Sequence, residues 1–564
     1  MLRLSKFKLI FIVFLLINSI AFSQTSFFAK DIAPTLNTEL PFKKAINLTT
    51  WLESYEHSGA GITYFGKQDF VNIKNLGAEA IRIPIHFDYW SSKDSEHSIN
   101  ALLFETLDDV VKWAEELKIY IILDCHINYQ RTPNINLDSF LSKIWRQIVT
   151  RYKNTSNYII YEILDNPEKV SSEKWYEIQG NIIKLIRQFD SSHSIIVGAS
   201  NRNSIDELEK MPNYNSYNLI YSFQFFEPML FTHQGADWIG LPNIRNIPFP
   251  YDQSKMPEVS YSLNDKERNL LNSYPKDSSV EYQKELLDRA IFFANIRRVP
   301  LFCSGFGVYQ KNTRTNDRIR WYKTVIPLLD KRKISRANWS YTGDFGMFIP
   351  GSANTFPTDL NTQLISALGF SIPTYKISSW IEDCTKIGKY EIYKNKISQK
   401  VSISTDLKET DNQIFLFKRD PRNGERCIYF PQFKAYSLIK FNFSKTCDFT
   451  SLYAKKARLE FWIKTTAQDI KFQIWFENSD TEDLKWRANY YILSEMIKND
   501  GEWQKISIPL VDFVDIGAYD DAKKTWINSQ GKFSWGDIES IQIQNSNYTL
   551  ETPLSIKDIE IVIQ

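Results

Sequence analysis

The stretch KIYIILDCH, residues 118–126, decides the fold, because it is a nearly continuous apolar run directly after the helical pattern ETLDDVVKWAEEL at 105–117. A strand that is buried on both faces has this composition. The same helix-then-strand order recurs at AEAIRIPI (78–85) and SNYIIYEIL (156–164). Repeated units of this kind predict a parallel sheet that is covered by helices.

The number of these units predicts which parallel sheet forms. Eight strand-like runs lie within about 330 residues, most of them preceded by a helical pattern, at 43–50, 78–85, 118–126, 156–164, 193–200, 217–226, 299–307 and 335–343. Eight β-α units are typical of a (β/α)8 barrel. We therefore predict an α/β fold of the TIM-barrel type for this part of the chain.

The hydrophobic pattern of the sequence changes near residue 385, where the helical patterns stop. Short alternating strands separated by polar turns follow, at 457–466, 470–478, 503–510, 538–545 and 556–564. This pattern predicts an all-β jelly-roll sandwich. We expect a signal peptide over 1–23, the barrel over 24–378 and the sandwich over 379–564.

The N-terminus has the pattern of an export signal. Arg3, Lys6 and Lys8 precede the apolar run LIFIVFLLINSIAF at 9–22, and Ala21 and Ser23 supply small residues for cleavage. The run is short for a membrane anchor, which is the alternative, and no later run is long enough to cross a bilayer. We expect an exported protein, secreted or periplasmic, with no membrane span.

Composition excludes several partners and leaves one open. The formal net charge is only +2 and no long run has a single sign, so no nucleic-acid partner is indicated. The five cysteines are widely spaced, although Cys427 and Cys447 could pair, and no CxxC or HxxxH pattern predicts a metal or another cofactor. Aromatic residues make up 15% of the chain; they either fill cores or stack on sugar rings.

A barrel of this type carries its site at the C-terminal ends of the strands. Polar and aromatic residues follow these ends, and tryptophans lie nearby. The candidates at or near the strand ends are Trp51, Arg82, Asp124, His126, Asp165, Asn166, Gln224, Phe226, Trp238, Gly305 and Trp339.

The order of these segments carries a family resemblance. INLTTWLE (46–53), YEILDNPEKV (161–170), YSFQFFEPMLFTHQGADW (221–238), CSGFGVY (303–309) and ANWSYTGDFGMF (337–348) together resemble glycoside hydrolase family 5, the cellulase-like retaining β-glycosidases. The similarity covers nearly all of residues 40–370. It implies that Arg82, His126 and Trp339 correspond to residues of that family's site, where they either bind sugar or only pack within the barrel.

The departures from the family lie at the chemistry. The resemblance implies Asn-Glu-Pro where this chain has Asp165, Asn166 and proline, and it places the nucleophilic Glu at Gly305. The His and Tyr of the family's HxY pattern become Gln224 and Phe226. A retaining glycosidase needs two carboxyl groups about 5 Å apart, one as acid and one as nucleophile. An amide and a glycine supply neither.

Replacement by another acid is not indicated. Asp165 lies one residue early, and a one-residue shift at a strand end redirects a side chain. Glu162 beside it occurs in the family together with a working acid, and its alternative role is a buried salt bridge inside the barrel. The leading hypothesis is therefore a protein that binds β-linked polysaccharide, of the β-glucan or β-mannan type, without cleaving it. A working hydrolase with displaced acids and a structural or protein-binding module are the alternatives.

The C-terminal region resembles the carbohydrate-binding sandwiches that accompany polysaccharide-degrading enzymes. Its stretches LEFWIKTTAQDIKFQIWFEN (459–478) and GEWQKISIPLVDF (501–513) carry this rhythm. Trp462 and Trp475 alternate with polar residues and are expected in the core. The candidates for a stacking face are Trp486, Tyr490, Tyr491, Tyr519 and Trp526.

Overall fold

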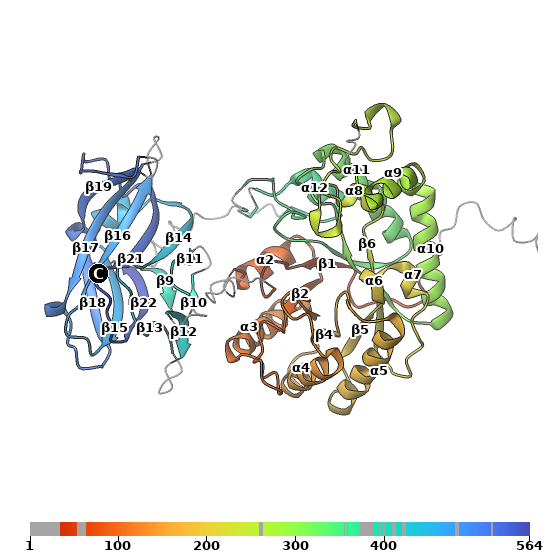
Figure 1. The fold of residues 1–564 in the computed structure, drawn as a ribbon, viewed down its shortest axis with the longest axis horizontal. Helices are drawn as coiled ribbons and strands as arrows, with labels where there is room; N and C mark the ends of the chain where they lie inside the picture. The colour runs from red at the N-terminus through yellow and green to blue at the C-terminus, as the bar shows by residue number, and fades with distance from the viewer. Residues whose placement is uncertain are drawn as a thin grey trace, which may run out of the picture.

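Two domains follow one another along the chain in the computed structural model (Figure 1). The structure describes residues 34–53, 62, 64–258, 263–352, 354, 356–357, 359–372, 389–394, 396–398, 401–408, 413–419, 425–479, 484–520 and 523–563. The predicted signal peptide and the predicted boundary at 378/379 lie outside these residues. Within them, none of the helices combines the length and the apolar composition needed to cross a membrane.

The first domain is a closed parallel barrel of eight strands in chain order, which confirms the predicted fold. Its strands are β1 (Lys44–Asn47), β2 (Ala80–His86), β3 (Tyr120–His126), β4 (Ile159–Glu162), β5 (Ser194–Gly198), β6 (Leu219–Phe225), β7 (Leu301–Phe306) and β8 (Ser335–Asn338). Neighbouring strands pair in parallel all the way round, with β1 closing the ring against β8.

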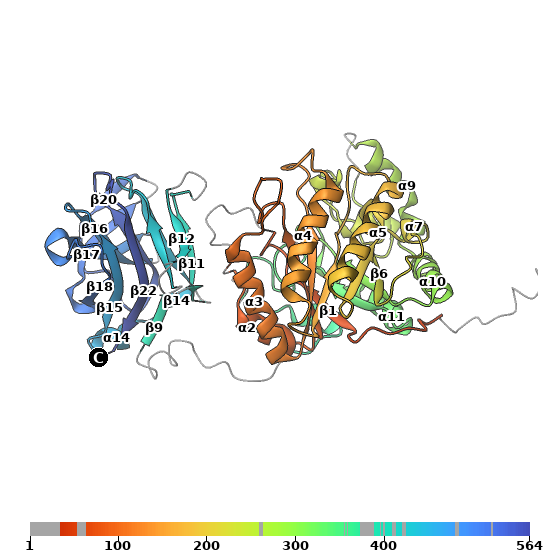
Figure 2. The same cartoon turned by 90° about the horizontal axis from the view of Figure 1, so that it is seen from below.

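Helices surround the barrel (Figures 1 and 2). They are α2 (Lys67–Asn75), α3 (Ala101–Leu117), α4 (Leu137–Tyr152), α5 (Ser172–Phe189), α6 (Ser200–Asn203), α7 (Ile205–Leu208), α8 (Met229–Thr232), α9 (Asp265–Asp277), α10 (Val280–Arg297), α11 (Thr315–Lys331) and α12 (Thr362–Ala367). Several of these helices have an N-terminal capping side chain. Ser171 accepts a hydrogen bond from the backbone N–H of Lys174 at the start of α5, and Ser279 accepts one from the backbone N–H of Tyr282 at the start of α10.

Alternation along the strands creates two layers inside the barrel. Ala80, Ile122, Ile160, Ile220 and Phe302 belong to one apolar cluster, with Ala45 and Ala337. Because side chains alternate with a period of two, the residues two positions further on point into the same interior, one layer closer to the C-terminal ends. That next layer is polar and consists of Asn47, Arg82, Asp124, Glu162, Ser222 and Ser304, all buried.

The second domain is an antiparallel sandwich of two seven-stranded sheets, as predicted. One sheet runs in the order β10 (Lys396–Ile397), β9 (Lys389–Lys394), β22 (Leu554–Val562), β13 (Arg426–Phe430) and β12 (Phe415–Arg419), with β15 (Arg458–Thr465) and β18 (Gln504–Pro509) joined through β22. The other sheet contains β11 (Val401–Thr405), β14 (Leu438–Cys447), β21 (Ile538–Asn545), β16 (Lys471–Ser479), β17 (Lys485–Leu493), β19 (Val514–Asp520) and β20 (Thr525–Ile527).

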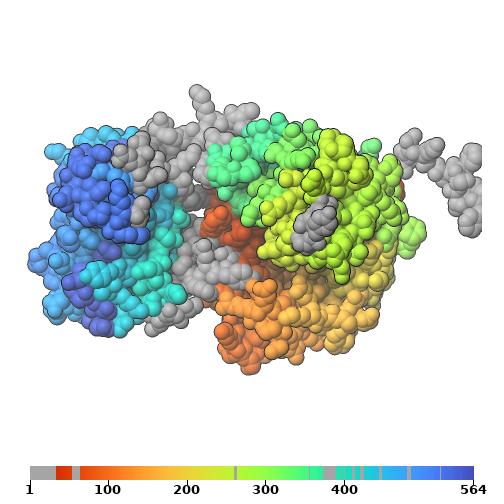
Figure 3. All heavy atoms as spheres, turned by 45° about the horizontal axis from the view of Figure 1, so that its top comes forward, coloured from red at the N-terminus to blue at the C-terminus, as the bar shows by residue number. Residues whose placement is uncertain are grey.

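The two domains stand side by side, the sandwich in blue and the barrel in red to green (Figure 3).

The cysteines do not form the pair that the sequence allowed: Cys427 and Cys447 are both buried, and no disulfide joins them. The Cys447 thiol lies 3.5 Å from the hydroxyl of Tyr390 instead.

Candidate functional site

Arg82 is the centre of the polar layer at the C-terminal side of the barrel. Its guanidinium is fully buried and binds Glu162 through two bonds, of 2.6 and 2.9 Å. The Nη2 atom also lies 2.9 Å from Asp124 and 3.0 Å from Asp165, and Nη1 donates to Asn47 at 3.0 Å. A guanidinium remains charged even when buried, so it holds three carboxyl groups from the ends of β3 and β4 at one point. Glu162 and Asp165 therefore take part in a buried ion-pair network.

His126, at the end of β3, lies between the carboxyl groups. Its Nε2 is 2.6 Å from Asp124 and 3.6 Å from Asp165, and its Nδ1 is 3.5 Å from Glu53. Burial lowers the pKa of His126, but the carboxylates of Asp124, Asp165 and Glu53 together outweigh burial and raise it to about 9. The imidazole is therefore positively charged at neutral pH.

Glu53 is a site residue that the sequence analysis did not single out. It follows β1, accepts a hydrogen bond from the backbone of Thr50 at 2.8 Å and faces His126 with a side chain that is 17% exposed. Burial raises its pKa above the ordinary range of a glutamate. In the sequence, only its position could have indicated a site residue, because it lies two residues after Trp51 and beyond the end of the first strand.

Gln224, at the end of β6, binds Asp165 rather than remaining free. Its Nε2 donates to both carboxylate oxygens of Asp165, at 2.9 and 3.2 Å. The backbone N–H of Asp165 donates to the carbonyl of Cys125 at 2.9 Å. With Arg82 as its third partner, the Asp165 carboxylate is fixed in place by both its main chain and its side chain.

The position of the expected acid, Asn166, has a left-handed backbone with a φ of +47°. This conformation is uncommon outside glycine and asparagine. The Asn166 amide donates to the carboxylate of Glu168 at 3.2 Å. The side chain thus pairs with its own loop.

The position of the expected nucleophile, Gly305, faces the site. A Cβ atom there would lie 3.4 Å from Trp339, 3.5 Å from Phe226 and 3.6 Å from Gln224, which are ordinary contact distances. A Cβ atom would therefore fit, and it would point among three of the predicted site residues.

Aromatic rings continue from this point to the rim. Trp339 stacks on His126 at 6.4 Å between ring centres and lies over the Arg82 guanidinium at 5.9 Å. Phe226 contacts Phe345, which is followed by Tyr309 and Trp238. Trp238 is 57% exposed, so the rings lead from the floor of the site to the solvent.

Trp51 does not belong to this lining, which corrects the expectation from the sequence. It is 1% exposed, and its indole N–H donates to the carbonyl of Ile62 at 2.8 Å. Its ring packs against Phe65 and Phe70, between the barrel and α2. A ring enclosed on all sides cannot stack on a ligand.

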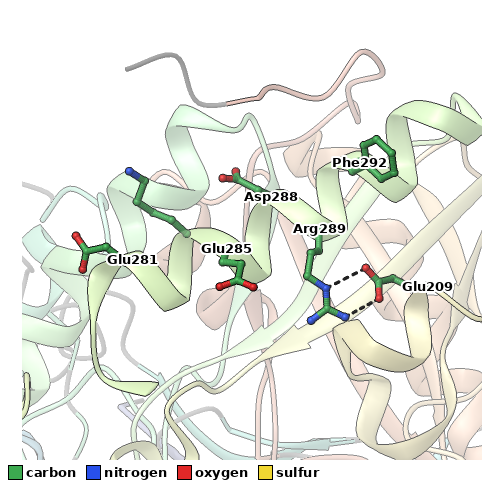
Figure 4. A pocket seen from close by; sticks show the side chains of 7 residues that line it. Glu209, Glu281, Glu285, Asp288, Arg289 and Phe292 are labelled. Atoms are coloured by element: carbon green, nitrogen blue, oxygen red, sulfur yellow. Dashed lines mark hydrogen bonds and ion pairs between the residues drawn. The ribbon is translucent and has the colours of Figure 1, made fainter. Parts of the chain in front are cut away.

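A hollow of about 480 Å³ lies elsewhere on the barrel, on the outer side of α10 (Figure 4). Its charges are partly paired, since Arg289 binds both carboxylate oxygens of Glu209. None of its residues lies at a strand end; they are Glu209, Glu281, Lys284, Glu285, Asp288, Arg289 and Phe292. This hollow is separate from the candidate site.

The sandwich carries a second aromatic surface, on the outer face of the sheet that contains β16 and β17. Arg487 lies over the rings of Trp475 and Trp526, at 5.0 and 5.7 Å, and its Nε donates to Glu477 at 2.9 Å. The indole N–H of Trp475 is buried, and it has no hydrogen-bond partner in the described part of the chain. Trp475 is thus buried as expected, but outside the hydrophobic core.

The predicted stacking residues divide between the two faces. Tyr491 and Trp526 are 47% and 42% exposed, and Tyr519 contacts the ring of Trp526. Trp486 is fully buried and Tyr490 packs on Phe513, so neither is available for stacking. The reason is the alternation along β17, where 487, 489 and 491 share the outer face.

Trp462, on β15, also differs from its expected place. It was expected in the core, but it is only partly buried. The ladder places it opposite Lys505 and Lys557.

Comparison with known families matches the barrel to a single model. Residues 44–344 match the cellulase model of glycosyl hydrolase family 5. The chain belongs to glycoside hydrolase family 5. Residues 381–562 of this family 5 chain match carbohydrate binding domain 30, so the sandwich is a carbohydrate-binding domain.

Two curated relatives of the family 5 barrel are endoglucanases. Endoglucanase 3 of Fibrobacter succinogenes is 26% identical over 333 residues, which are 55% of this chain and 50% of that protein. Endoglucanase C of Acetivibrio thermocellus is 27% identical over 323 residues, 53% of this chain and 91% of that protein. The chain thus spans half of the first relative.

Among solved structures, the cellulose synthase subunit Z of Clostridioides difficile is similar. It is 26% identical, with a TM-score of 0.47, over 58% of this chain and 99% of that one. Cel5A of Thermotoga maritima in complex with cellobiose is 23% identical, with a TM-score of 0.48, over 58% and 97%.

Proposed function

We propose that this family 5 barrel binds β-linked polysaccharide without cleaving it. The observation that carries the proposal is Gly305, which faces Trp339, Phe226 and Gln224 with no side chain. Retaining hydrolysis requires a carboxylate that attacks the anomeric carbon and a second carboxyl that protonates the leaving oxygen. The amide of Asn166 has no acidic proton, and general acid help alone is worth about 10²–10⁴-fold in rate.

Asp165 is a poor substitute for the missing acid. Its carboxylate already accepts two bonds from Gln224 and lies 3.0 Å from Arg82. These contacts hold both of its carboxylate oxygens within the floor of the site.

The residues that remain suit ligand binding. Trp339, Phe226 and the exposed Trp238 offer apolar faces on which sugar rings stack, and the side-chain carbonyl of Gln224 can accept a hydrogen bond from a hydroxyl group. In the second domain, Tyr491 and Trp526 offer exposed rings of the same kind. We infer a ligand of the β-glucan or β-mannan type because the family and the carbohydrate-binding domain point to such polymers. We also infer that the protein is exported.

The test uses purified full-length protein in affinity gels that contain β-glucan, xyloglucan or mannan, together with a reducing-end assay on the same polymers. Retarded migration without product is expected. Product release would overturn the proposal, and migration unchanged by every polymer would favour a structural role.

One observation favours a second candidate, a working hydrolase with displaced acids. Glu53 and Asp165 lie near opposite nitrogens of His126, at 3.5 and 3.6 Å, and burial raises the pKa of Glu53. In that case Glu53→Gln would abolish the release of reducing ends.

A further inference from the structure

Two arginines stand directly opposite each other at the edge of the sandwich. Arg419 ends β12, Arg426 begins β13, and the ladder pairs them residue to residue. Both guanidinium groups are permanently charged. Like charges at directly opposite positions destabilise an antiparallel pair. An anion that contacts both arginines would therefore stabilise this end of the hairpin.

That anion is on the other domain. Glu105, on α3 of the barrel, accepts from Arg419 Nη1 through Oε1 at 3.2 Å and forms an ion pair with Arg426 through Oε2. Both ion pairs that Glu105 makes with described residues therefore cross between the domains. Figures 1 and 2 agree on this arrangement, since α3 is among the barrel helices nearest the sandwich and β12 is on the facing side.

Burial indicates which contact contributes more. The side chain of Arg426 is 19% exposed and that of Glu105 is 26% exposed, whereas Arg419 is 64% exposed. Exposed ion pairs contribute little because water and salt screen them, and partly buried pairs are screened less. Arg426 with Glu105 is the stronger contact, and Arg419 adds a second donor to the same carboxylate.

We propose that the β12–β13 arginine pair is a carboxylate receptor that docks the sandwich onto Glu105 of the barrel and fixes the angle between the two domains. The end of the hairpin that carries Arg419 and Arg426 belongs to the sheet that contains β12, β13 and β22. The aromatic surface around Tyr491 and Trp526 belongs to the other sheet. Docking therefore leaves the outer face of the second sheet open to a ligand.

Docking has a consequence that rests on the proposed function. Two binding surfaces in a fixed orientation can bind one long polymer together. Binding at the first surface then raises the effective concentration of polymer at the second, more than it would if the two domains moved freely. The gain is absent for oligosaccharides that are too short to reach both surfaces. Loss of docking should thus reduce affinity for long chains selectively.

Small-angle X-ray scattering of the full chain tests the docking without any ligand. Glu105→Arg is expected to increase the maximum dimension and to broaden the distance distribution, and about 1 M salt should have a similar effect on the wild type. Asp109→Asn, an exposed carboxylate one turn further along α3, is the matched control and should change nothing. Combining Glu105→Arg with Arg419→Glu and Arg426→Glu should restore the compact distribution.

An unchanged scattering profile for Glu105→Arg would overturn the proposal. So would a loss of binding to uronic-acid polymers in Arg426→Ala with compactness retained, because the arginines would then recognise an acidic sugar. If the wild type binds no polymer while the scattering behaves as expected, the docking stands and the proposed function fails.

Discussion

Gln224 donates its side-chain amide to both carboxylate oxygens of Asp165. These two residues come from the ends of β6 and β4, and their pairing bridges β5, the strand that lies between them in the barrel. Because the amide and the carboxylate satisfy each other's hydrogen bonds, they stabilise the floor of the site. They also leave fewer groups there for proton transfer.

Removing the amide should destabilise the barrel. We expect Gln224→Ala to lower the free energy of unfolding by about 1.5–3 kcal/mol, since hydrogen bonds to charged groups contribute in that range. Urea unfolding measures the change. Gln130→Ala, at an exposed glutamine on the loop after β3, serves as a control. An effect of similar size in the control would mean that the Asp165 contact is not responsible.

Restoring both acids should test whether the cleft still positions a sugar. Asn166→Glu combined with Gly305→Glu is expected to release reducing ends from β-glucan, because the space at Gly305 accommodates a Cβ atom. The left-handed φ of Asn166 disfavours glutamate, so we expect a slow rate. The isosteric pair Asn166→Gln with Gly305→Gln is the control. If the restored variant folds and binds polymer but stays inactive, the cleft no longer holds a glycoside in a reactive position.

The stability of the barrel should fall as the pH rises. The pKa of His126 is raised from 6.5 to about 9, so its contribution is fully present below pH 6.5 and is lost as the pH rises through about 9. Burial raises the pKa of Glu162 to about 7. The stability that this group contributes is therefore also lost as the pH rises, here between about pH 4.5 and 7. Urea midpoints between pH 6 and 10 measure the trend.

His126→Gln isolates the upper part of this pH dependence. The difference in stability between wild type and variant should shrink by up to about 3 kcal/mol between pH 6.5 and 9.5, from 1.36 kcal/mol for each pKa unit. A difference that does not vary with pH would show that the imidazole is not charged in the folded protein.

The two tryptophans at 486 and 526 should separate stability from binding. Trp526→Ala, at a 42% exposed ring, is expected to leave the stability within about 0.5 kcal/mol and to weaken polymer binding about tenfold. Trp486→Ala, at a fully buried ring, should cost about 3–5 kcal/mol of unfolding free energy. Calorimetric titration and urea unfolding measure both. Equal binding by wild type and Trp526→Ala would remove this ring from the proposed site.

The fold was predictable because its signals are long and repeated. Strands buried on both faces have an unmistakable apolar composition, and eight of them in order specify a barrel. Arg82, Asp124 and Asp165 were expected at one site because the C-terminal ends of the barrel strands carry the site. Their mutual ion pairs were not predicted.

Other features lacked such a signal. Glu53 is one carboxylate in a loop after β1, with no pattern to set it apart. Trp51 looks the same in sequence whether it lines a cleft or packs under α2. In β17 both faces carry aromatic residues, so the sequence does not reveal which of Trp486 and Tyr491 points outward.

The layered interior of the barrel places two kinds of residue at different depths. Ile122, Ile160 and Ile220 belong to the apolar cluster, and buried polar residues lie two positions further along the same strands. The apolar layer therefore supplies stability to the barrel without depending on the loops beyond the strand ends. Such an architecture lets recognition evolve in those loops while each intermediate remains a well-folded molecule.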